Sequence, residues 1–431
     1  MNGRHGSIPD STQDTLTLAQ ARRAVLAVTI GNGLEFYDFM TFAFFAIAIG
    51  QTFFPSVNPY LSLMASLATF GAGFITRPLG AHVLGGYADR VGRKPAMMVS
   101  MMLMGLGIAL LALTPGYASI GYAAPLIAVI ARLIQGFALG GEVGSASAYL
   151  LEAVPSGRRG LSISLQGVSQ DIAGTIGGLV GLGLSLVMTE AQLGTIGWRI
   201  ALMLGVLIVP VALLMRGSLP ETHQPAADRA TGAVPFGRYA RVVLLGIVLI
   251  ASSTSGGYIF RYMATYGQAS LHLSGAVAFA GQTANTAVAV VVGVFGGWLS
   301  DRVGRRPAMI WPQLAFLAAI LPCFVWLTTA RTATAFIGAN VILSVLATTQ
   351  FSAIYAAITE SLPPGVRART FALIYSVPVA VFGGSTQLIV TWLLHATGSP
   401  MAIAWYLTGF VAIGLVAMIA FRESAPARLS G

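Results

Sequence analysis

The sequence predicts an all-α membrane protein with twelve transmembrane helices in two pseudo-symmetric six-helix bundles. Three observations lead to this prediction: a very apolar composition, twelve long apolar runs, and a loop motif that occurs twice. Of the 431 residues, 56% are hydrophobic and only 9% are charged, whereas soluble domains carry about 25% charged residues. Because so few charges cannot form a water-soluble shell, lipid must cover most of the surface.

The apolar runs define the expected helices, since about 20 apolar residues are enough to cross a bilayer. The runs occupy residues 24–50, 60–86, 96–114, 122–151, 160–188 and 197–216, and then 240–266, 274–299, 308–329, 332–360, 370–396 and 399–421. We therefore predict five parts along the chain: an N-terminal tail (1–23), a six-helix bundle (24–216), a polar linker (217–239), a second six-helix bundle (240–421) and a C-terminal tail (422–431).

The charges are placed as in a membrane protein rather than a nucleic-acid-binding one. The net charge is +10, and the chain has 24 Lys and Arg residues. Nineteen of them lie in the two tails, in the linker and near the loops that follow even-numbered spans. Cytoplasmic loops carry such an excess of basic residues. We therefore expect both termini in the cytoplasm, a lipid environment and no nucleic-acid partner.

A short basic loop occurs once after the second span of each half. Residues 85–95 read GGYADRVGRKP and residues 296–307 read GGWLSDRVGRRP, which places Asp89 and Asp301 212 positions apart. A second pair, Glu152 and Glu360, lies 208 positions apart near the end of the fourth span of each half. Two similar offsets indicate duplication of a six-helix unit.

The repeated loop has the chemistry of a latch between helix ends. A turn is expected at its glycine, Gly92 or Gly304. The aspartate is suited to accept hydrogen bonds from backbone amides at a helix N-terminus, or to pair with an arginine. The alternative is that these loops are basic only because they face the cytoplasm. The residues assigned to gating are Asp89, Arg90, Arg93, Asp301, Arg302 and Arg305.

The doubled loop resembles the cytoplasmic signature of the major facilitator superfamily. Three further segments resemble the metabolite:proton symporter family within it: GNGLEFYDF at 31–39, RPLG at 77–80 and RLIQGFALGGE at 132–142. Residues 53–55, 70–74 and 380–384 make the chain most similar to citrate and tricarballylate symporters. The resemblance extends from about residue 25 to 420.

This resemblance implies a major facilitator fold and secondary active transport by alternating access. The expected activity is proton-coupled uptake of a small organic anion, with a tricarboxylate such as citrate or tricarballylate as first candidate. The expected location is a bacterial inner membrane. A monomer is expected, with no cofactor, because the proton gradient drives transport. Carriers of 2-oxoglutarate, shikimate and betaine or proline belong to the same family and remain alternatives.

Charged residues inside the spans are the candidate functional groups, because each costs about 2.5–3.5 kcal/mol at mid-bilayer. The acids Glu35, Asp38, Glu142 and Asp171 are assigned to proton coupling. Glu35 and Asp38 lie three residues apart and share a helix face, and two close carboxylates do not both ionise readily. The alternative is that they only hold Arg77 or Arg132 in an ion-pair network.

Substrate binding is assigned to polar residues of the same spans. Arg132, Gln135 and Glu142 lie on one face of the fourth span, whereas Gly136 and Gly140 form a separate ridge for close helix packing. Arg132 has the planar fork that suits a carboxylate, although a permanent pair with an acid of the first span is the alternative. The complete set is Arg132, Arg77, Gln135, Gln166, Gln170, Tyr37 and Arg261.

Asp171 and Arg261 depart from the citrate-type pattern. Citrate-type relatives tend to have glutamine in place of Asp171, which is therefore either a further protonatable site or a partner for an extra arginine. Arg261 instead reaches the membrane interface in the alternative interpretation, and the preceding residues 254–258 are a candidate break in the helix. Polar residues of the second half either form a neutral wall of the pocket or hold neighbouring helices together by hydrogen bonds: Gln282, Asn285, Asn340, Gln350, Tyr355, Tyr375 and Gln387.

Other functions were weighed against symport. A proton-coupled drug exporter would have the same fold, but residues 173–178 lack the proline of the exporter signature. A channel or a sensor lacks support, because no filter repeat and no signalling domain is present in the sequence. An enzyme is not expected, because no nucleophile–base pattern, phosphate loop or metal-ligand spacing occurs. No catalytic residue and no metal site are assigned.

Overall fold

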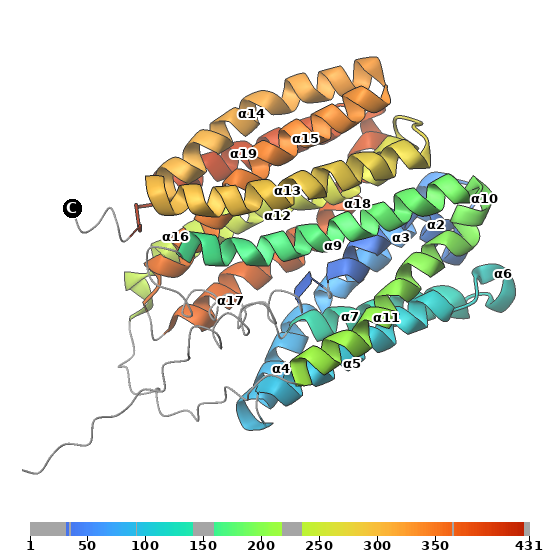
Figure 1. The fold of residues 1–431 in the computed structure, drawn as a ribbon, viewed down its shortest axis with the longest axis horizontal. Helices are drawn as coiled ribbons and strands as arrows, with labels where there is room; N and C mark the ends of the chain where they lie inside the picture. The colour runs from blue at the N-terminus through green and yellow to red at the C-terminus, as the bar shows by residue number, and fades with distance from the viewer. Residues whose placement is uncertain are drawn as a thin grey trace, which may run out of the picture.

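A computed structural model describes residues 32–33, 36–91, 93–140, 159–217, 235–363 and 366–425. Within these residues, all regular secondary structure is helical, and the long helices run side by side along the molecule (Figure 1). The N-terminal tail, most of the linker and the end of the C-terminal tail lie outside the described residues. The prediction of an all-α membrane protein is confirmed.

The first bundle contains six spans in chain order. A bent pair, Phe36–Phe44 and α2 (Ala46–Phe53), forms the first. The others are α3 (Pro59–Ile75) with α4 (Arg77–Val91), then α5 (Arg93–Leu113), α7 (Ala123–Gly140), α9 (Arg159–Val187) and α11 (Trp198–Gly217). Short elements connect them: α6 (Tyr117–Ile120), α10 (Glu190–Gln192) and the π-helix η2 (Leu193–Gly197).

The second bundle begins after the 3-10 turn η3 (Phe236–Arg238). Its spans are α12 (Ala240–Ala269), α13 (Gly275–Val303), α14 (Arg305–Ala330), α15 (Ala333–Thr349) with α16 (Phe351–Ser361), α17 (Arg367–Pro378) with the π-helix η5 (Val379–Gly383) and α18 (Gly384–Thr397), and α19 (Ala402–Ala420). Each coincides with a predicted apolar run.

Length and composition support membrane crossing. Among the described residues, ten helices are long and apolar enough to span a bilayer, and the bent pair is an eleventh if its parts are one span. α11, which is 20 residues long, occupies the sixth predicted span. Two details differ from prediction. The first span bends by 74°, and α12 continues unbroken through residues 254–258, so the predicted helix break there is wrong.

Local sequence sets the helix ends. Ser274 and Thr332 are side-chain N-caps that accept from the amides of Val277 and Ala335, as short hydroxyl residues commonly do. Between α13 and α14, Gly304 has φ 97°, a backbone conformation that favours glycine. The turn expected at Gly304 is therefore present, whereas Gly92 lies outside the described residues.

Glycines bring the helices of the first bundle close together. A Cβ atom at Gly136 would lie 1.6 Å from the Gly73 carbonyl oxygen, and one at Gly140 would lie 2.0 Å from that of Arg77. Because no side chain fits there, α7 packs directly on the backbones of α3 and α4. This contact confirms the predicted small-residue ridge at these two glycines.

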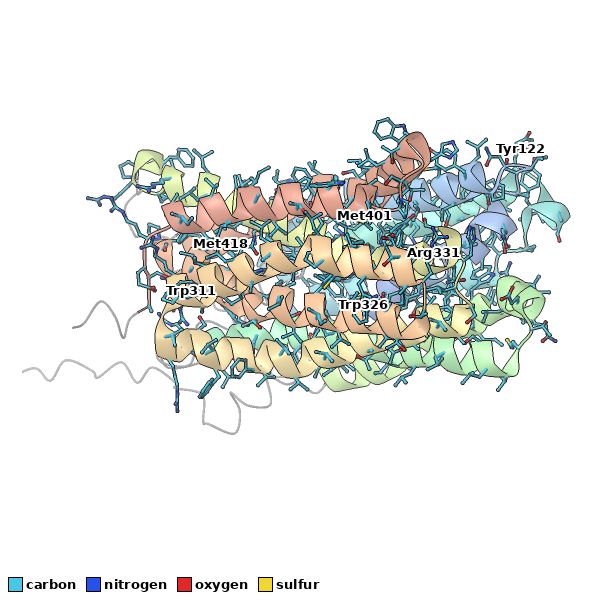
Figure 2. All side chains as sticks on the ribbon, turned by 90° about the horizontal axis from the view of Figure 1, so that it is seen from above. Tyr122, Trp311, Trp326, Arg331, Met401 and Met418 are labelled. Atoms are coloured by element: carbon cyan, nitrogen blue, oxygen red, sulfur yellow. The ribbon has the colours of Figure 1, made fainter. Side chains whose placement is uncertain are left out.

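Two helix pairs join the bundles. α9 lies along α13 (Figure 1), and a Cβ atom at Gly297 would be 2.8 Å from the carbonyl oxygen of Gly160. On the other side, one at Gly71 of α3 would be 2.6 Å from that of Gly384 of α18. The outer surface remains strongly apolar along its length: Trp311 and Trp326 of α14 (Figure 2) are 71% and 40% exposed, as expected for lipid-facing side chains.

Candidate functional site

A cavity of about 150 Å³ lies where the two bundles meet. The first bundle contributes residues of the Phe36–Phe44 helix and α9, and the second contributes residues of α12 to α17 and α19. Most of the polar lining is neutral: Ser252, Ser253, Thr254, Gln282, Asn285, Gln313, Ser344, Thr348, Gln350 and Ser352. Such a mixture of hydroxyl and amide groups suits a small polar ligand.

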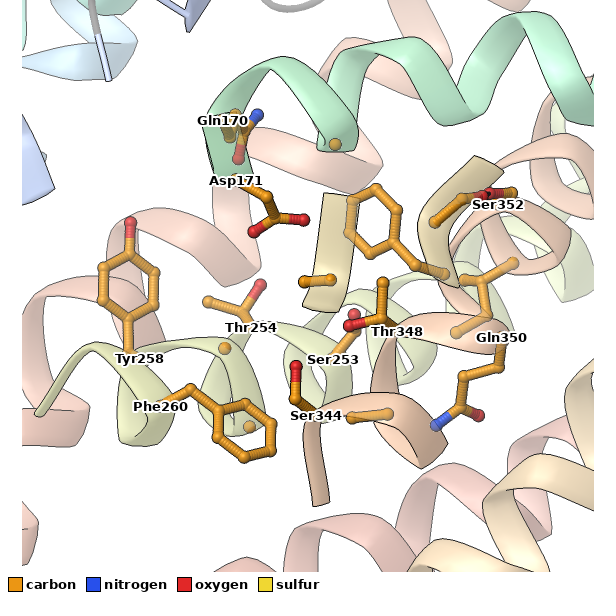
Figure 3. A pocket seen from close by; sticks show the side chains of 18 of the residues that line it. Gln170, Asp171, Ser253, Thr254, Tyr258, Phe260, Ser344, Thr348, Gln350 and Ser352 are labelled. Atoms are coloured by element: carbon orange, nitrogen blue, oxygen red, sulfur yellow. Dashed lines mark hydrogen bonds between the residues drawn. The ribbon is translucent and has the colours of Figure 1, made fainter. Parts of the chain in front are cut away.

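Asp171 and Arg261 are the two charged residues in the described lining of this cavity. The Asp171 side chain extends from α9 toward Thr254 and Thr348 (Figure 3). Arg261 comes from α12, where its Nε donates to Met40 Sδ at 3.1 Å and its Cζ lies 4.7 Å from the ring centroid of Tyr258. Arg261 and Asp171 line the same cavity from opposite bundles. The structure therefore brings the predicted acid Asp171 and the predicted arginine Arg261 to one cavity.

Arg132 lies in a different place, among buried side chains outside the described cavity lining. Its Nη1 is 3.1 Å from Asp38 Oδ2 and 2.6 Å from Gln135 Oε1, and the side chains of Arg132 and Asp38 are 0% and 1% exposed. The guanidinium also lies 3.8 Å from the centroid of the Phe42 ring. The structure thus has the pair between Arg132 and an acid of the first span. Nε and Nη2 of Arg132 and Oδ1 of Asp38 have no hydrogen-bond partner within the described chain.

Arg77 is also buried and lies between aromatic rings. Its Cζ is 4.1 Å from the Phe74 centroid and 4.8 Å from that of Phe39. Its Nε and Nη2 have no hydrogen-bond partner among the described residues. Tyr258 packs on Phe39 and Phe74 and also lines the cavity. The rings that contact Arg77 therefore also contact a residue of the cavity lining.

The remaining predicted binding residues divide between the cavity and the helix contacts. Gln170 lines the cavity. Tyr37 instead donates its hydroxyl hydrogen to the carbonyl oxygen of Ala201 at 2.9 Å. Gln166 is buried in α9, where its backbone carbonyl oxygen accepts from Asn32 Nδ2 at 3.1 Å. The proton-coupling candidates Glu35 and Glu142 lie outside the described residues, as do the side chains of Asp89 and Arg93, whereas Arg90 is exposed.

The neutral wall predicted for the second half is present in large part. Five of its seven members line the cavity: Gln282, Asn285, Gln350, Tyr355 and Tyr375. Of the other two, Asn340 donates to the Phe336 carbonyl oxygen of its own helix at 2.8 Å, and Gln387 of α18 donates to the Tyr258 carbonyl oxygen of α12 at 3.4 Å. The sequence analysis missed Ser344 and Thr348, whose spacing of four residues places both on one face of α15.

The second repeated loop makes both contacts expected of its aspartate. Asp301 accepts hydrogen bonds from the amides of Gly160 at 2.9 Å and Leu161 at 3.0 Å, at the N-terminus of α9. The same carboxylate pairs with Arg305 Nη1 at 2.8 Å. Since α9 belongs to the first bundle, Asp301 ties the two bundles together. Arg302 takes no part in this tie; its guanidinium lies over the ring of Trp298 at 4.4 Å.

Arg305 also contacts two acids later in the chain, Glu360 and Glu423. Its Nε and Nη2 make a two-pronged contact with Glu360 at 3.0 and 2.8 Å. Glu423, which the sequence analysis did not single out, accepts from the amides of Arg305 and Arg306 at 2.8 and 3.0 Å and caps α14. Burial alone would raise the pKa of Glu423, but backbone hydrogen bonds from four residues lower it below its usual value.

Known proteins resemble this chain over almost its full length. A family model described as the Major Facilitator Superfamily matches residues 29–377. A citrate-proton symporter of Salmonella typhi is 37% identical over 409 residues, which cover 91% of this chain and 92% of that protein. One of Klebsiella pneumoniae is 37% identical over 416 residues, with 94% and 93% covered. The crystal structure of a D-xylose-proton symporter superimposes with a TM-score of 0.77, and the match covers 94% of this chain and 98% of that chain. At 15% sequence identity, this similarity is one of fold.

Proposed function

Because this chain belongs to the Major Facilitator Superfamily, we propose that it is a proton-coupled symporter that takes up a small polycarboxylate, with citrate as first candidate. The cavity between the bundles carries this proposal, because it places an arginine and an acid among neutral hydroxyl and amide groups. The similarity to two citrate-proton symporters supports the choice of anion. In this proposal a substrate carboxylate binds Arg261, whose planar fork matches it.

Coupling to protons is assigned to Asp38 and its partner Arg132. Nε and Nη2 of Arg132 have no hydrogen-bond partner within the described chain, so the arginine has donors left for a second carboxylate. A substrate carboxylate that binds these donors shares the guanidinium with Asp38, so that less of the positive charge compensates the buried Asp38 carboxylate. An uncompensated buried charge costs about 3–5 kcal/mol, and proton uptake by Asp38 removes that cost. Anion and proton then bind cooperatively, as symport requires.

Alternating access follows from the tie at Asp301. While this carboxylate bonds the N-terminus of α9, the bundles are held together at that end, and release of the tie lets them separate. We assign this end to the cytoplasm, with both termini, and the protein to a bacterial inner membrane. The bundles 24–216 and 240–421 move as units of a monomer, and the proton gradient supplies the energy without a cofactor.

Transport by purified protein in liposomes tests the proposal. With an inward proton gradient, labelled citrate should accumulate, and a protonophore should abolish the accumulation. 2-Oxoglutarate and betaine serve as competing substrates. Arg261→Gln should reduce citrate uptake at least tenfold, because the arginine contacts the carboxylate, whereas Arg331→Gln, at an exposed arginine outside the described cavity lining, should leave uptake unchanged. Efflux of cationic dyes without uptake of any polycarboxylate would refute the proposal.

A further inference from the structure

Among the described residues, neither charged group of the cavity has all of its hydrogen-bonding atoms paired. Within the described chain, no group donates a hydrogen bond to the Asp171 carboxylate; the one bond recorded for this residue is to its backbone carbonyl oxygen, from Thr175. Other described acids are better satisfied, because Asp38 pairs with Arg132 and Asp301 pairs with Arg305. Asp171 is therefore an acceptor that faces the cavity and remains available.

Arg261 offers hydrogen-bond donors, whereas Asp171 offers an acceptor. Its Nε is used by Met40 Sδ, and its flat face lies against Tyr258. Its two Nη groups have no acceptor among the described residues. A guanidinium held by its edge and one face keeps a fixed orientation, and the free Nη groups offer a fork to a carboxylate. Within the part of the chain that the structure describes, the cavity thus presents unpaired donors on α12 and an unpaired acceptor on α9.

A ligand that satisfies both groups must carry an acceptor and a donor. In its ionised form Asp171 is acceptor-only, so in that form it repels a ligand carboxylate and attracts a hydroxyl hydrogen. A polycarboxylate with a hydroxyl group meets both requirements, because its carboxylate binds Arg261 and its hydroxyl donates to Asp171. A polycarboxylate without a hydroxyl leaves Asp171 unpaired or in contact with a like charge, and unpaired buried polar groups strongly disfavour binding.

We propose that Asp171 is a specificity-determining residue that accepts a hydrogen bond from a substrate hydroxyl, so that the site selects hydroxylated over unsubstituted polycarboxylates. This inference rests on the proposed function and goes beyond it by naming the substrate feature that is recognised. It also assigns to Asp171 a role other than carrying the coupled proton. A residue that only carried the proton would not distinguish hydroxylated from unsubstituted anions.

Citrate and tricarballylate provide the test, because they share a skeleton and three carboxylates and differ in the central hydroxyl. Binding to the purified full-length protein should be measured by calorimetry for wild type, Asp171→Leu and Asp171→Asn. Wild type should bind citrate at least about tenfold more tightly than tricarballylate, because the citrate hydroxyl adds a hydrogen bond to a charged group. Asp171→Leu should lose that preference and bind tricarballylate no more weakly than wild type does. Asp171→Asn, which keeps an acceptor oxygen, should retain part of the preference.

The ratio of the two affinities distinguishes this role from a structural one, since misfolding lowers both affinities together. Arg261→Gln is the matched control and should weaken both ligands by a similar factor. Equal affinities of wild type for the two anions, or an unchanged ratio in Asp171→Leu, would overturn the inference while leaving polycarboxylate transport intact. Failure of wild type to bind either anion would instead refute the proposed function, and the inference with it.

Discussion

Asp301→Asn should loosen the contact between the two bundles while leaving each bundle folded. The carboxylate bonds the amides of Gly160 and Leu161 with its two oxygens, and one of these oxygens also pairs with Arg305. An asparagine has a single acceptor oxygen and no charge, so at least one charge-assisted bond is lost. Such a bond contributes about 1.5–3 kcal/mol, and a loss of about 2 kcal/mol corresponds to roughly a thirtyfold shift in the opening equilibrium.

Hydrogen–deuterium exchange in lipid nanodiscs measures this opening at the amides concerned. The peptide that contains Gly160 and Leu161 should exchange roughly thirtyfold faster in Asp301→Asn, while peptides from the centre of α13 should not change. Arg302→Gln is the control, because Arg302 is next in sequence but contacts Trp298 rather than α9. Unchanged exchange at Gly160 and Leu161 in Asp301→Asn would refute the assignment of Asp301 as the tie between bundles.

Three further predictions concern the buried pair, the helix packing and the tail. Arg132→Ala should destabilise the protein by about 3–5 kcal/mol, because Asp38 remains buried without a cation. Replacing both Arg132 and Asp38 by leucine should restore most of the stability. An equal loss of stability in the double variant would contradict the ion-pair account. Gly136→Val should disrupt packing on α3, whereas Gly85→Val, with open space around its Cβ position, should unfold at the wild-type temperature. Glu423→Gln should unfold more easily than wild type near pH 7. Because the folded pKa of Glu423 is lowered, its stabilisation is complete above the unfolded value of about 4.3 and disappears as the pH falls through the folded value, so the two unfolding temperatures should converge in acid.

The helices could be predicted from hydropathy because lipid requires long uninterrupted apolar segments. The tie at Asp301 was also accessible from the sequence, since the repeat singled out the aspartate and its possible partners are few. The bend after Phe44 could not be predicted from the sequence, because the residues next to it are apolar. The hydropathy of such a run is the same whether the helix axis is straight or bent. Glu423 was missed for a related reason: a lone acid in a short tail has no periodicity to reveal the helix N-terminus that it caps.

The three membrane arginines show where sequence reasoning ends for the site. Arg77, Arg132 and Arg261 are alike in sequence, because each is an arginine well inside an apolar run. In the structure they differ in their neighbours: Arg77 packs against aromatic rings, Arg132 pairs with Asp38, and Arg261 lines the cavity. Helical periodicity predicts which residues share a face, but it does not predict which other helix that face meets. The substrate and coupling roles of these residues remain predictions.

The most direct test of proton–polycarboxylate symport is the movement of protons driven by citrate alone. Liposomes with equal pH on both sides, a trapped pH-sensitive dye and a clamped membrane potential should acidify inside when citrate is added outside. The same citrate addition should produce no acidification with Arg261→Gln, because the anion then lacks its guanidinium. Acidification that depends on citrate and on Arg261 is the result we predict. Citrate entry without any change of internal pH would contradict the account.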